Sequence, residues 1–300
     1  MKKKILVVST SLAIGGVERS LLSLLHALDP EEYLVDLMLT ECDGALQHLI
    51  PTHVRVVYFP CRWVLIRKGK VFQSLLEAIG FNLNALKLLF YLAKGIFSNN
   101  LGKARQQFYQ SVMHTLPRIP GHFDAAIDYS GGYKAFILNK TDANRKISWV
   151  HGDYRVFPRE RSIDADDYRR LDTIVAVSET CRDIFVTAFP MTRDKCLVMP
   201  NITLKSSIVA LSHQEVDFDS DYQGIRIVDV TRLDPDKGLD MAIEACAQLV
   251  AWGYDVKWYL VGEGPEKERL TRLIAGHGLS ERFILLGSKE NPYPYIQRAD

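Results

Sequence analysis

Two cations, Arg232 and Lys237, lie in a short segment between an apolar run at 225–231 and an amphipathic pattern at 239–252. The first pattern predicts a strand and the second predicts a helix. Gly238 permits a sharp entry into that helix. Two cations at the carboxyl end of a strand can hold a diphosphate through charge-assisted hydrogen bonds. The alternative is a solvated surface pair, which is common for Arg and Lys in loops.

A glycine loop follows the next predicted strand, VKWYLV (256–261), and precedes a helical pattern at 265–277. Ligands of open parallel sheets bind beyond the carboxyl ends of the strands. Two neighbouring strands that end in a basic loop and a glycine loop therefore favour a nucleoside diphosphate site over coincidence. The residues of this glycine loop are Gly262, Glu263, Gly264 and Pro265.

A glycine pair, Gly15 and Gly16, follows the first apolar run, KILVVST (4–10), and precedes a helical pattern at 18–28. Glycine lets the backbone approach a ligand closely, and the first turn of a helix offers free N–H groups to an anion. The pair is not a GxGxxG fingerprint. A tight turn between a strand and a helix is the alternative.

His151 ends the apolar run KISWVH (146–151) and stands beside Gly152. A lone histidine more often has a structural role than a catalytic one. Its place at the carboxyl end of a predicted strand favours a position in a ligand-binding cleft.

Strand-like runs rich in Val, Ile and Leu alternate with helical patterns along most of the chain, which predicts parallel sheets covered on both faces. The runs are 4–10, 33–40, 54–59, 123–129, 146–151, 173–178 and 195–200, then 225–231, 256–262 and 282–287. The segment 203–221 is rich in Ser and Asp and suits a linker. The sequence thus predicts an α/β protein with two doubly wound domains, 1–202 and 222–300, and a last helix near 292–299.

The composition excludes several classes of protein. A net charge of +1 over 300 residues gives no bias toward nucleic acid. Five scattered cysteines without a CxxC pattern favour a reducing cytoplasm over a disulfide framework or a metal site. The first apolar run is too short for a signal peptide, and no stretch reaches the roughly 18 apolar residues of a spanning helix. These features predict a soluble or peripheral protein.

The segment 62–116 holds eight Lys and Arg residues and the single acid Glu77. Within 83–97, apolar and basic residues gather on opposite sides of a predicted helix. Such a helix can lie on an anionic membrane surface. It can equally be a helical layer packed on the first sheet, because amphipathicity does not distinguish a core from a membrane.

Several stretches, in this order, resemble the retaining glycosyltransferases of family 4. These enzymes have the GT-B fold, in which two Rossmann-like domains carry the active site between them. The resemblance spans nearly the whole chain except 62–116. The stretches are IGGVERSLLSLLHAL, VHGDY, DTIVAVSE, VMPNI, VTRLDPDKGLDMAIEA, LVGEGPEKERL and FILLGSKENPYPYIQRAD.

The resemblance implies a role for each candidate residue. Arg232 and Lys237 match the pair that holds the donor diphosphate in place of a metal, so no cofactor beyond a nucleotide diphosphate sugar is expected. Gly15 and Gly16 match a loop near the donor phosphate or the acceptor, and residues 262–265 match a stretch near the nucleotide. His151 matches a residue near the transferred sugar. The residues expected on the acceptor side are Glu18 and Asp153. No DxD pattern followed by further ligands is obvious, and DSD at 219–221 lies in the expected linker.

The sequence departs from the family pattern after Asp300. In the family, the helix that matches PYIQRAD leads to a strand and to a loop with two glutamates that contact the sugar and the ribose. The second GT-B domain is therefore expected to be incomplete here, and the 300-residue chain is expected not to turn over.

The resemblance implies transfer of a sugar, with retention of configuration, to a glycan or a lipid-linked acceptor in bacterial surface polysaccharide synthesis. The expected location is the cytoplasm, with peripheral attachment to the inner membrane face. Two alternatives stay open: a non-catalytic nucleotide-binding module and a GT-B nucleotide-sugar epimerase.

Overall fold

The structure of the protein is a computed structural model. It describes residues 1–41, 44–58, 90–91, 93–98, 100–156, 160–216, 218 and 221–300. The chain divides into two compact units, Met1–Ile202 and Thr203–Asp300. Each unit has its own parallel sheet, so the predicted α/β class is confirmed.

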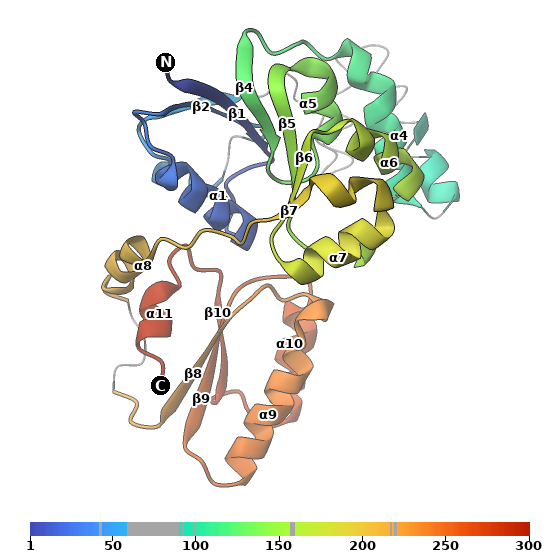
Figure 1. The fold of residues 1–300 in the computed structure, drawn as a ribbon. Helices are drawn as coiled ribbons and strands as arrows, with labels where there is room; N and C mark the ends of the chain where they lie inside the picture. The colour runs from blue at the N-terminus through green and yellow to red at the C-terminus, as the bar shows by residue number, and fades with distance from the viewer. Residues whose placement is uncertain are drawn as a thin grey trace. The chain divides into compact units, whose positions relative to one another are not determined.

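The first unit is built on seven parallel strands (Figure 1). Their bounds are β1 (Lys3–Ser9), β2 (Tyr33–Leu39), β3 (Val54–Tyr58), β4 (His122–Asp128), β5 (Asp142–Val150), β6 (Thr173–Ala176) and β7 (Cys196–Val198). Their order in the sheet is β3-β2-β1-β4-β5-β6-β7. This is the doubly wound order, which reverses direction beside β1.

Helices cover both faces of this sheet because alternate side chains of each buried strand point to opposite sides. Leu21 and Leu25 pack with Ile5 and Val7 on one face. On the other face, Phe185 and its neighbours pack with Leu6 and Val8. The helices are α1 (Gly16–Ala27), α4 (Leu101–Val112), α5 (Lys134–Lys140), α6 (Arg161–Arg170) and α7 (Glu179–Ala188).

The strand register brings three loops to the carboxyl edge of this sheet. Val8 of β1 pairs with Asp128 of β4, and Asp128 pairs with Ser148 of β5. The chain therefore leaves β1, β4 and β5 at the same edge, where ligands of such sheets bind.

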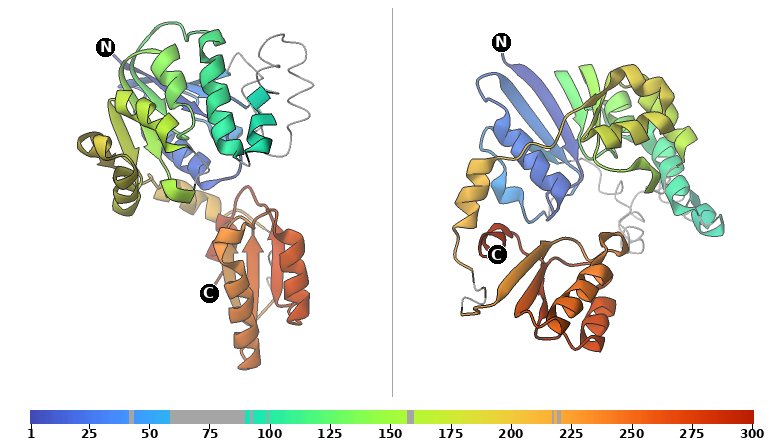
Figure 2. Two further views of the ribbon diagram at one scale, coloured as in Figure 1. Left: turned by 90° about the vertical axis from the view of Figure 1, so that its right-hand side faces the viewer. Right: turned by 60° about the horizontal axis from the view of Figure 1, so that its bottom comes forward.

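The second unit has three parallel strands and helices on both faces, as Figure 2 shows. The leucines of α9 and α10 pack with Phe283 on one face, and Phe218 and Tyr295 pack with Tyr259 on the other. Its elements are α8 (Lys205–Ser212), β8 (Ile225–Val230), α9 (Leu239–Ala251), β9 (Val256–Val261), α10 (Lys267–Gly276), β10 (Phe283–Gly287) and α11 (Tyr293–Gln297), and the sheet order is β10-β9-β8.

The segment 203–221 is more structured than the expected linker. It contains α8, and Asn291 donates to the Leu211 carbonyl at 2.8 Å. Phe218 is buried against Tyr259 and Tyr295. The segment therefore forms part of the second unit, and its polar composition concealed a helix.

The basic segment 62–116 lies partly outside the described residues, which resume at 90. Residues 90–91 and 93–97 are helical, and α4 follows. Phe90 and Phe97, expected on the apolar side of the predicted helix, are 63% and 92% exposed. In the part of the chain that the structure describes, no helix is long and apolar enough to cross a membrane.

Candidate functional site

The loop after β8 presents Arg232 and Lys237 at the carboxyl end of the strand. Leu233, between them, is buried and fixes the loop to the core. The Arg232 guanidinium pairs with Asp234, and its side chain is 73% exposed. Lys237 Nζ lies 3.0 Å from the Asp236 carboxylate. Both cations thus point outward, each held by an acid of the same loop.

The two cations pair with two different carboxylates of this loop, Arg232 with Asp234 and Lys237 with Asp236. The pKa of Asp236 is lowered, first by the hydrogen bond from Lys237. A diphosphate could take the place of these carboxylates, since its oxygens accept the same charge-assisted hydrogen bonds.

The glycine loop, residues 262–265, is hydrogen-bonded to the loop after β8 that carries Arg232 and Lys237, called the cation loop below. Leu233 N donates to the Glu263 carbonyl, and Glu266 N donates to the Leu233 carbonyl, both at 3.1 Å. A Cβ on Gly264 would lie 2.5 Å from the Leu233 carbonyl oxygen, and one on Gly262 would overlap the Thr231 carbonyl. Only glycine permits this approach. The structure thus brings the two predicted loops side by side.

Glu263 and Pro265 complete the glycine loop. Glu263 Oε1 accepts from Lys267 Nζ at 2.7 Å and lies beside Gly287 at the end of β10. Pro265 lies in the turn before α10, which begins at Lys267 rather than at 265. The Glu263 carboxylate therefore spans the edge between β9 and β10.

Gly15 is the N-cap of α1 and Gly16 is its first residue, so the helix begins earlier than the predicted start near 18. Gly16 has open space around it, whereas a Cβ on Gly15 would overlap the Glu18 carboxylate. The first turn of α1 thus already faces an acid of its own chain. A phosphate there would meet like charge, so the geometry favours a neutral hydroxyl at this loop.

His151 is held by the neighbouring strand. Its Nε2 lies 2.7 Å from the Tyr129 carbonyl, and its ring centroid lies 4.8 Å from that of Tyr129. A carbonyl can only accept, so Nε2 carries the proton in this assignment. Burial lowers the pKa of His151, and Nδ1 is buried with no hydrogen-bond partner among the described residues. Neutral His151 can therefore accept a hydrogen bond from a ligand hydroxyl.

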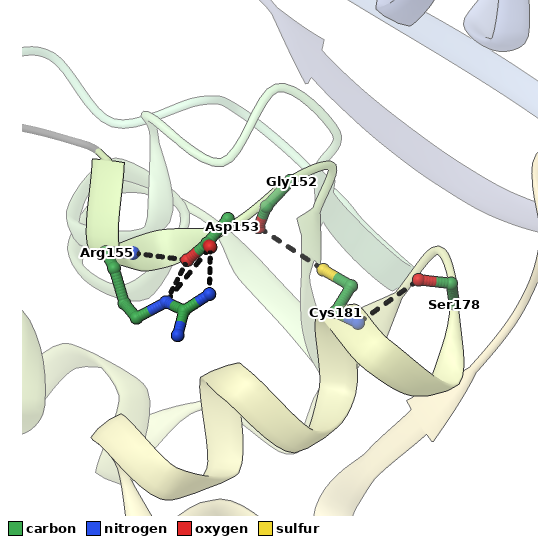
Figure 3. Close-up of polar contacts among 5 residues, drawn as sticks. All are labelled: Gly152, Asp153, Arg155, Ser178 and Cys181. Carbon is green, nitrogen blue, oxygen red and sulfur yellow. Dashed lines mark hydrogen bonds and ion pairs between the residues drawn. The ribbon is translucent and has the colours of Figure 1, made fainter.

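Asp153 is occupied by Arg155 (Figure 3). The Arg155 Nε lies 3.0 Å from both carboxylate oxygens, and its terminal nitrogen lies 2.6 Å from Oδ2. These hydrogen bonds lower the pKa of Asp153. A carboxylate held in this way is a weak base, so Asp153 is suited to position Arg155 rather than to take a proton.

Ser130 is a site residue that the sequence analysis missed. Its Oγ is buried without a partner in the described part of the chain, directly after β4. The following Gly131 has φ +73°, and a Cβ there would lie 2.9 Å from the Trp149 carbonyl. Ser130 and His151 are thus on adjoining loops. The run DYSGGY, a strand end followed by serine and two glycines, was the available signal.

Metal ligands are not grouped in the described residues. No cluster of three or more His, Cys, Asp or Glu residues that could hold a metal ion occurs among them.

The sequence of the second unit matches a known family. Residues 215–300 match the model of glycosyl transferases group 1. The matched residues contain both the cation loop, with Arg232 and Lys237, and the glycine loop described above. The match supports membership of that superfamily.

Curated relatives match part of the chain. A 4-alpha-N-acetylgalactosaminyltransferase of Campylobacter jejuni, which acts on a diphospho-undecaprenol-linked substrate according to its name, is 29% identical over 133 residues. That match covers 44% of this chain and 34% of the relative. The GPI3 subunit of a Saccharomyces cerevisiae phosphatidylinositol N-acetylglucosaminyltransferase is 27% identical, over 39% of this chain and 26% of its own length. The chain thus matches about a third or less of either relative.

Solved structures match nearly the whole chain. Anabaena HepE, crystallised with UDP and glucose, has a TM-score of 0.61 at 17% identity and covers 99% of this chain and 72% of its own. S. aureus TarM, crystallised with UDP, has a TM-score of 0.60 at 13% identity and covers 97% of this chain and 78% of its own. At these identities the likeness shows the fold. The GT-B architecture predicted from the sequence is confirmed.

Proposed function

We propose that the protein is a retaining glycosyltransferase that takes a sugar from a nucleotide diphosphate sugar. The observation that carries this proposal is the loop after β8, in which Arg232 and Lys237 each pair with a carboxylate and which is hydrogen-bonded to the glycine loop after β9. That arrangement suits a diphosphate, and it neutralises the charge that develops as the diphosphate leaves. The glycosyl transferases group 1 match and the UDP bound to the structural neighbours support it.

In this proposal, His151 Nδ1 and Ser130 Oγ bind hydroxyl groups of the transferred sugar. Both atoms are buried and lack partners within the described structure. An unmet buried polar group costs free energy, which a sugar hydroxyl would recover on binding. No described side chain near His151 is placed as a nucleophile, because Asp153 is engaged by Arg155. The leaving phosphate oxygen would then help to deprotonate the acceptor hydroxyl, and the configuration is retained. The reaction needs no metal, because the two cations hold the diphosphate.

The proposed acceptor is a glycan or a lipid-linked glycan of a bacterial surface polysaccharide, reached from the cytoplasmic face of the membrane. The Campylobacter relative, named for a diphospho-undecaprenol-linked substrate, and a putative colanic acid biosynthesis glycosyltransferase of Salmonella typhimurium support this substrate class.

A thermal-shift screen tests the donor. UDP-glucose, UDP-N-acetylglucosamine, UDP-N-acetylgalactosamine and GDP-mannose would be compared, and the true donor should raise Tm by mass action. Arg232→Ala should abolish the shift. Arg272→Ala, an exposed cation on α10, should leave it unchanged. If no nucleotide sugar or free nucleoside diphosphate shifts Tm at millimolar concentration, the proposal fails. Product analysis then separates a transferase from an epimerase and from a binding module without turnover.

Peripheral membrane attachment is the second part of this proposal. Phe90, Ile96 and Phe97 are 63%, 69% and 92% exposed beside the exposed Lys94. Exposed apolar side chains next to cations can insert at an anionic lipid surface. The helical residues 90–91 and 93–97 therefore have the composition that a membrane contact requires.

We expect Lys94→Glu with Phe97→Ser to weaken binding to vesicles of phosphatidylglycerol and phosphatidylcholine. Raised salt should weaken binding of the unaltered protein, because it screens the lysine. Trp252→Ser removes a side chain that is 67% exposed in the second unit and serves as the control. Absence of sedimentation with vesicles at low salt would show that the segment is not a membrane contact.

A further inference from the structure

We propose that Cys181 is a positioning residue that fixes the backbone on both sides of His151. The inference rests on the proposed function, in which His151 Nδ1 receives a hydroxyl of the donor sugar. It adds a residue of α7 that touches no ligand but sets where that nitrogen lies.

The geometry places the Cys181 thiol against two carbonyl groups. Its Sγ lies 3.4 Å from the Val150 carbonyl oxygen. It lies 3.3 Å from the Gly152 carbonyl oxygen (Figure 3). These two residues flank His151 in the chain. One S–H proton can therefore be shared between the peptide groups that precede and follow the histidine.

The thiol itself is held in place from α7. Ser178 is the N-cap of this helix, and its Oγ accepts from Cys181 N at 3.1 Å. The start of α7 and the loop after β5 are thus joined through one side chain. A cap of this kind stabilises the first turn of a helix, so the backbone that carries the Cys181 side chain is held in place.

The ring and the backbone of His151 are held by different elements. The Tyr129 carbonyl, which follows β4, accepts the hydrogen bond from His151 Nε2. The Cys181 thiol of α7 donates to the carbonyls of the residues on either side of His151. The Val150 carbonyl also accepts from Val177 N at 3.3 Å, so the backbone before His151 has a second support. Loss of the thiol would therefore release chiefly the Gly152 carbonyl, which lets the backbone after His151 move and the ring pivot about the Tyr129 contact.

Chemical reactivity does not explain the cysteine. Burial raises the pKa of Cys181, so the group is a protonated thiol and acts as a hydrogen-bond donor. Cys196 belongs to the same apolar core and is also buried. Among the described residues, no hydrogen bond of the Cys196 thiol is found. Cys196 therefore supplies a control with equal volume and no donor role.

Calorimetry with two probes tests the proposal: UDP alone, and the UDP-sugar from the screen that binds best. Cys181→Ala should leave the affinity for UDP unchanged and lower the affinity for the UDP-sugar by about tenfold, the effect of one lost hydrogen bond. Cys181→Ser should retain most of the affinity, since a hydroxyl can donate to the same carbonyls. Cys196→Ala should lower Tm about as much as Cys181→Ala does, without changing the affinity for UDP or for the UDP-sugar.

A double-mutant cycle separates this role from the proposed function. In a His151→Ala background, Cys181→Ala should add no further loss of sugar affinity. If His151→Ala weakens sugar binding and Cys181→Ala does not, the positioning role is overturned. If Cys196→Ala has the same effect as Cys181→Ala, the cysteine acts only through packing, which also overturns it. If neither probe binds the unaltered protein, the proposed function fails, and the inference that rests on it falls with it.

Discussion

Replacement of Arg232 by Ala is expected to lower the turnover of sugar transfer by about 10²–10³-fold. The guanidinium pairs with Asp234 and the Lys237 ammonium pairs with Asp236, both in the loop after β8. In the proposed reaction, the leaving diphosphate occupies that position and gains negative charge as the bond to the sugar breaks. Loss of a donor that meets charge developed in the transition state lowers kcat more than it weakens binding of the substrate.

Lys237→Ala should have a similar effect, and Arg232→Lys should fall between the alanine variant and the unaltered protein. Lysine keeps the charge but loses the planar fork that binds two oxygens at once. The measurement is kcat at saturating donor in the full-length protein. Arg272→Ala removes an exposed cation from the same unit and should leave kcat unchanged.

Asp236→Asn tests whether the carboxylate competes with the diphosphate. The substitution removes the charge that now holds Lys237, so the affinity for UDP should stay the same or rise. Unaltered turnover in both alanine variants would contradict the role assigned to the two cations.

The fold could be predicted from the sequence because its strands are buried on both faces. Runs such as KILVV and TIVAV carry the signal of a parallel sheet, and their register follows from the shared carboxyl edge. The helix α8 could not be predicted, because its apolar residues 208–211 are consecutive and are not spaced along one face of a helix. Its contact with Asn291 is a tertiary one that the local pattern does not encode.

The sequence predicted which loops form the candidate site but not the contacts between their side chains. The order of strand, glycine and helix placed the loop at 262–265 beside Arg232, since neighbouring parallel strands end at one edge. The pairing of Arg232 with Asp234 depends on side-chain geometry that spacing does not specify. The role of Cys181 could not be predicted from the sequence, because this residue contacts the loop of His151 only in the folded protein.

A buried ion pair supports the loop that carries His151. Of the substitutions described here, we expect loss of this pair to lower the stability of the protein most. Lys134 Nζ of α5 lies 2.6 Å from the Asp164 carboxylate of α6, and the two side chains are 5% and 3% exposed. Tyr154, three residues after His151, donates to Asp164 at 2.6 Å. The Lys134 ammonium also lies 4.8 Å from the centre of the Tyr168 ring. The pair thus joins two helices to the loop that carries His151.

Asp164→Ala would remove the carboxylate that lies 2.6 Å from the buried Lys134 ammonium. Removing one member of a buried pair costs about 3–5 kcal/mol, because the remaining charge stays out of water. For a unit of this size, Tm should fall by about 6–20 °C in thermal unfolding followed by circular dichroism. Asp166→Ala on the same helix breaks an exposed pair with Arg169 and should cause a much smaller loss.

The combination of Lys134→Met, Asp164→Leu and Tyr154→Phe separates charge burial from packing. Replacing the members of a buried ion pair by apolar side chains of similar volume is often neutral or stabilising, because the desolvation cost of both charges is removed. This variant should therefore recover most of the Tm lost in Asp164→Ala. It should still bind the donor sugar more weakly than the unaltered protein, because Tyr154 no longer anchors the His151 loop to α6. A Tm in Asp164→Ala close to that of Asp166→Ala would show that water reaches the pair and that it does not hold the loop.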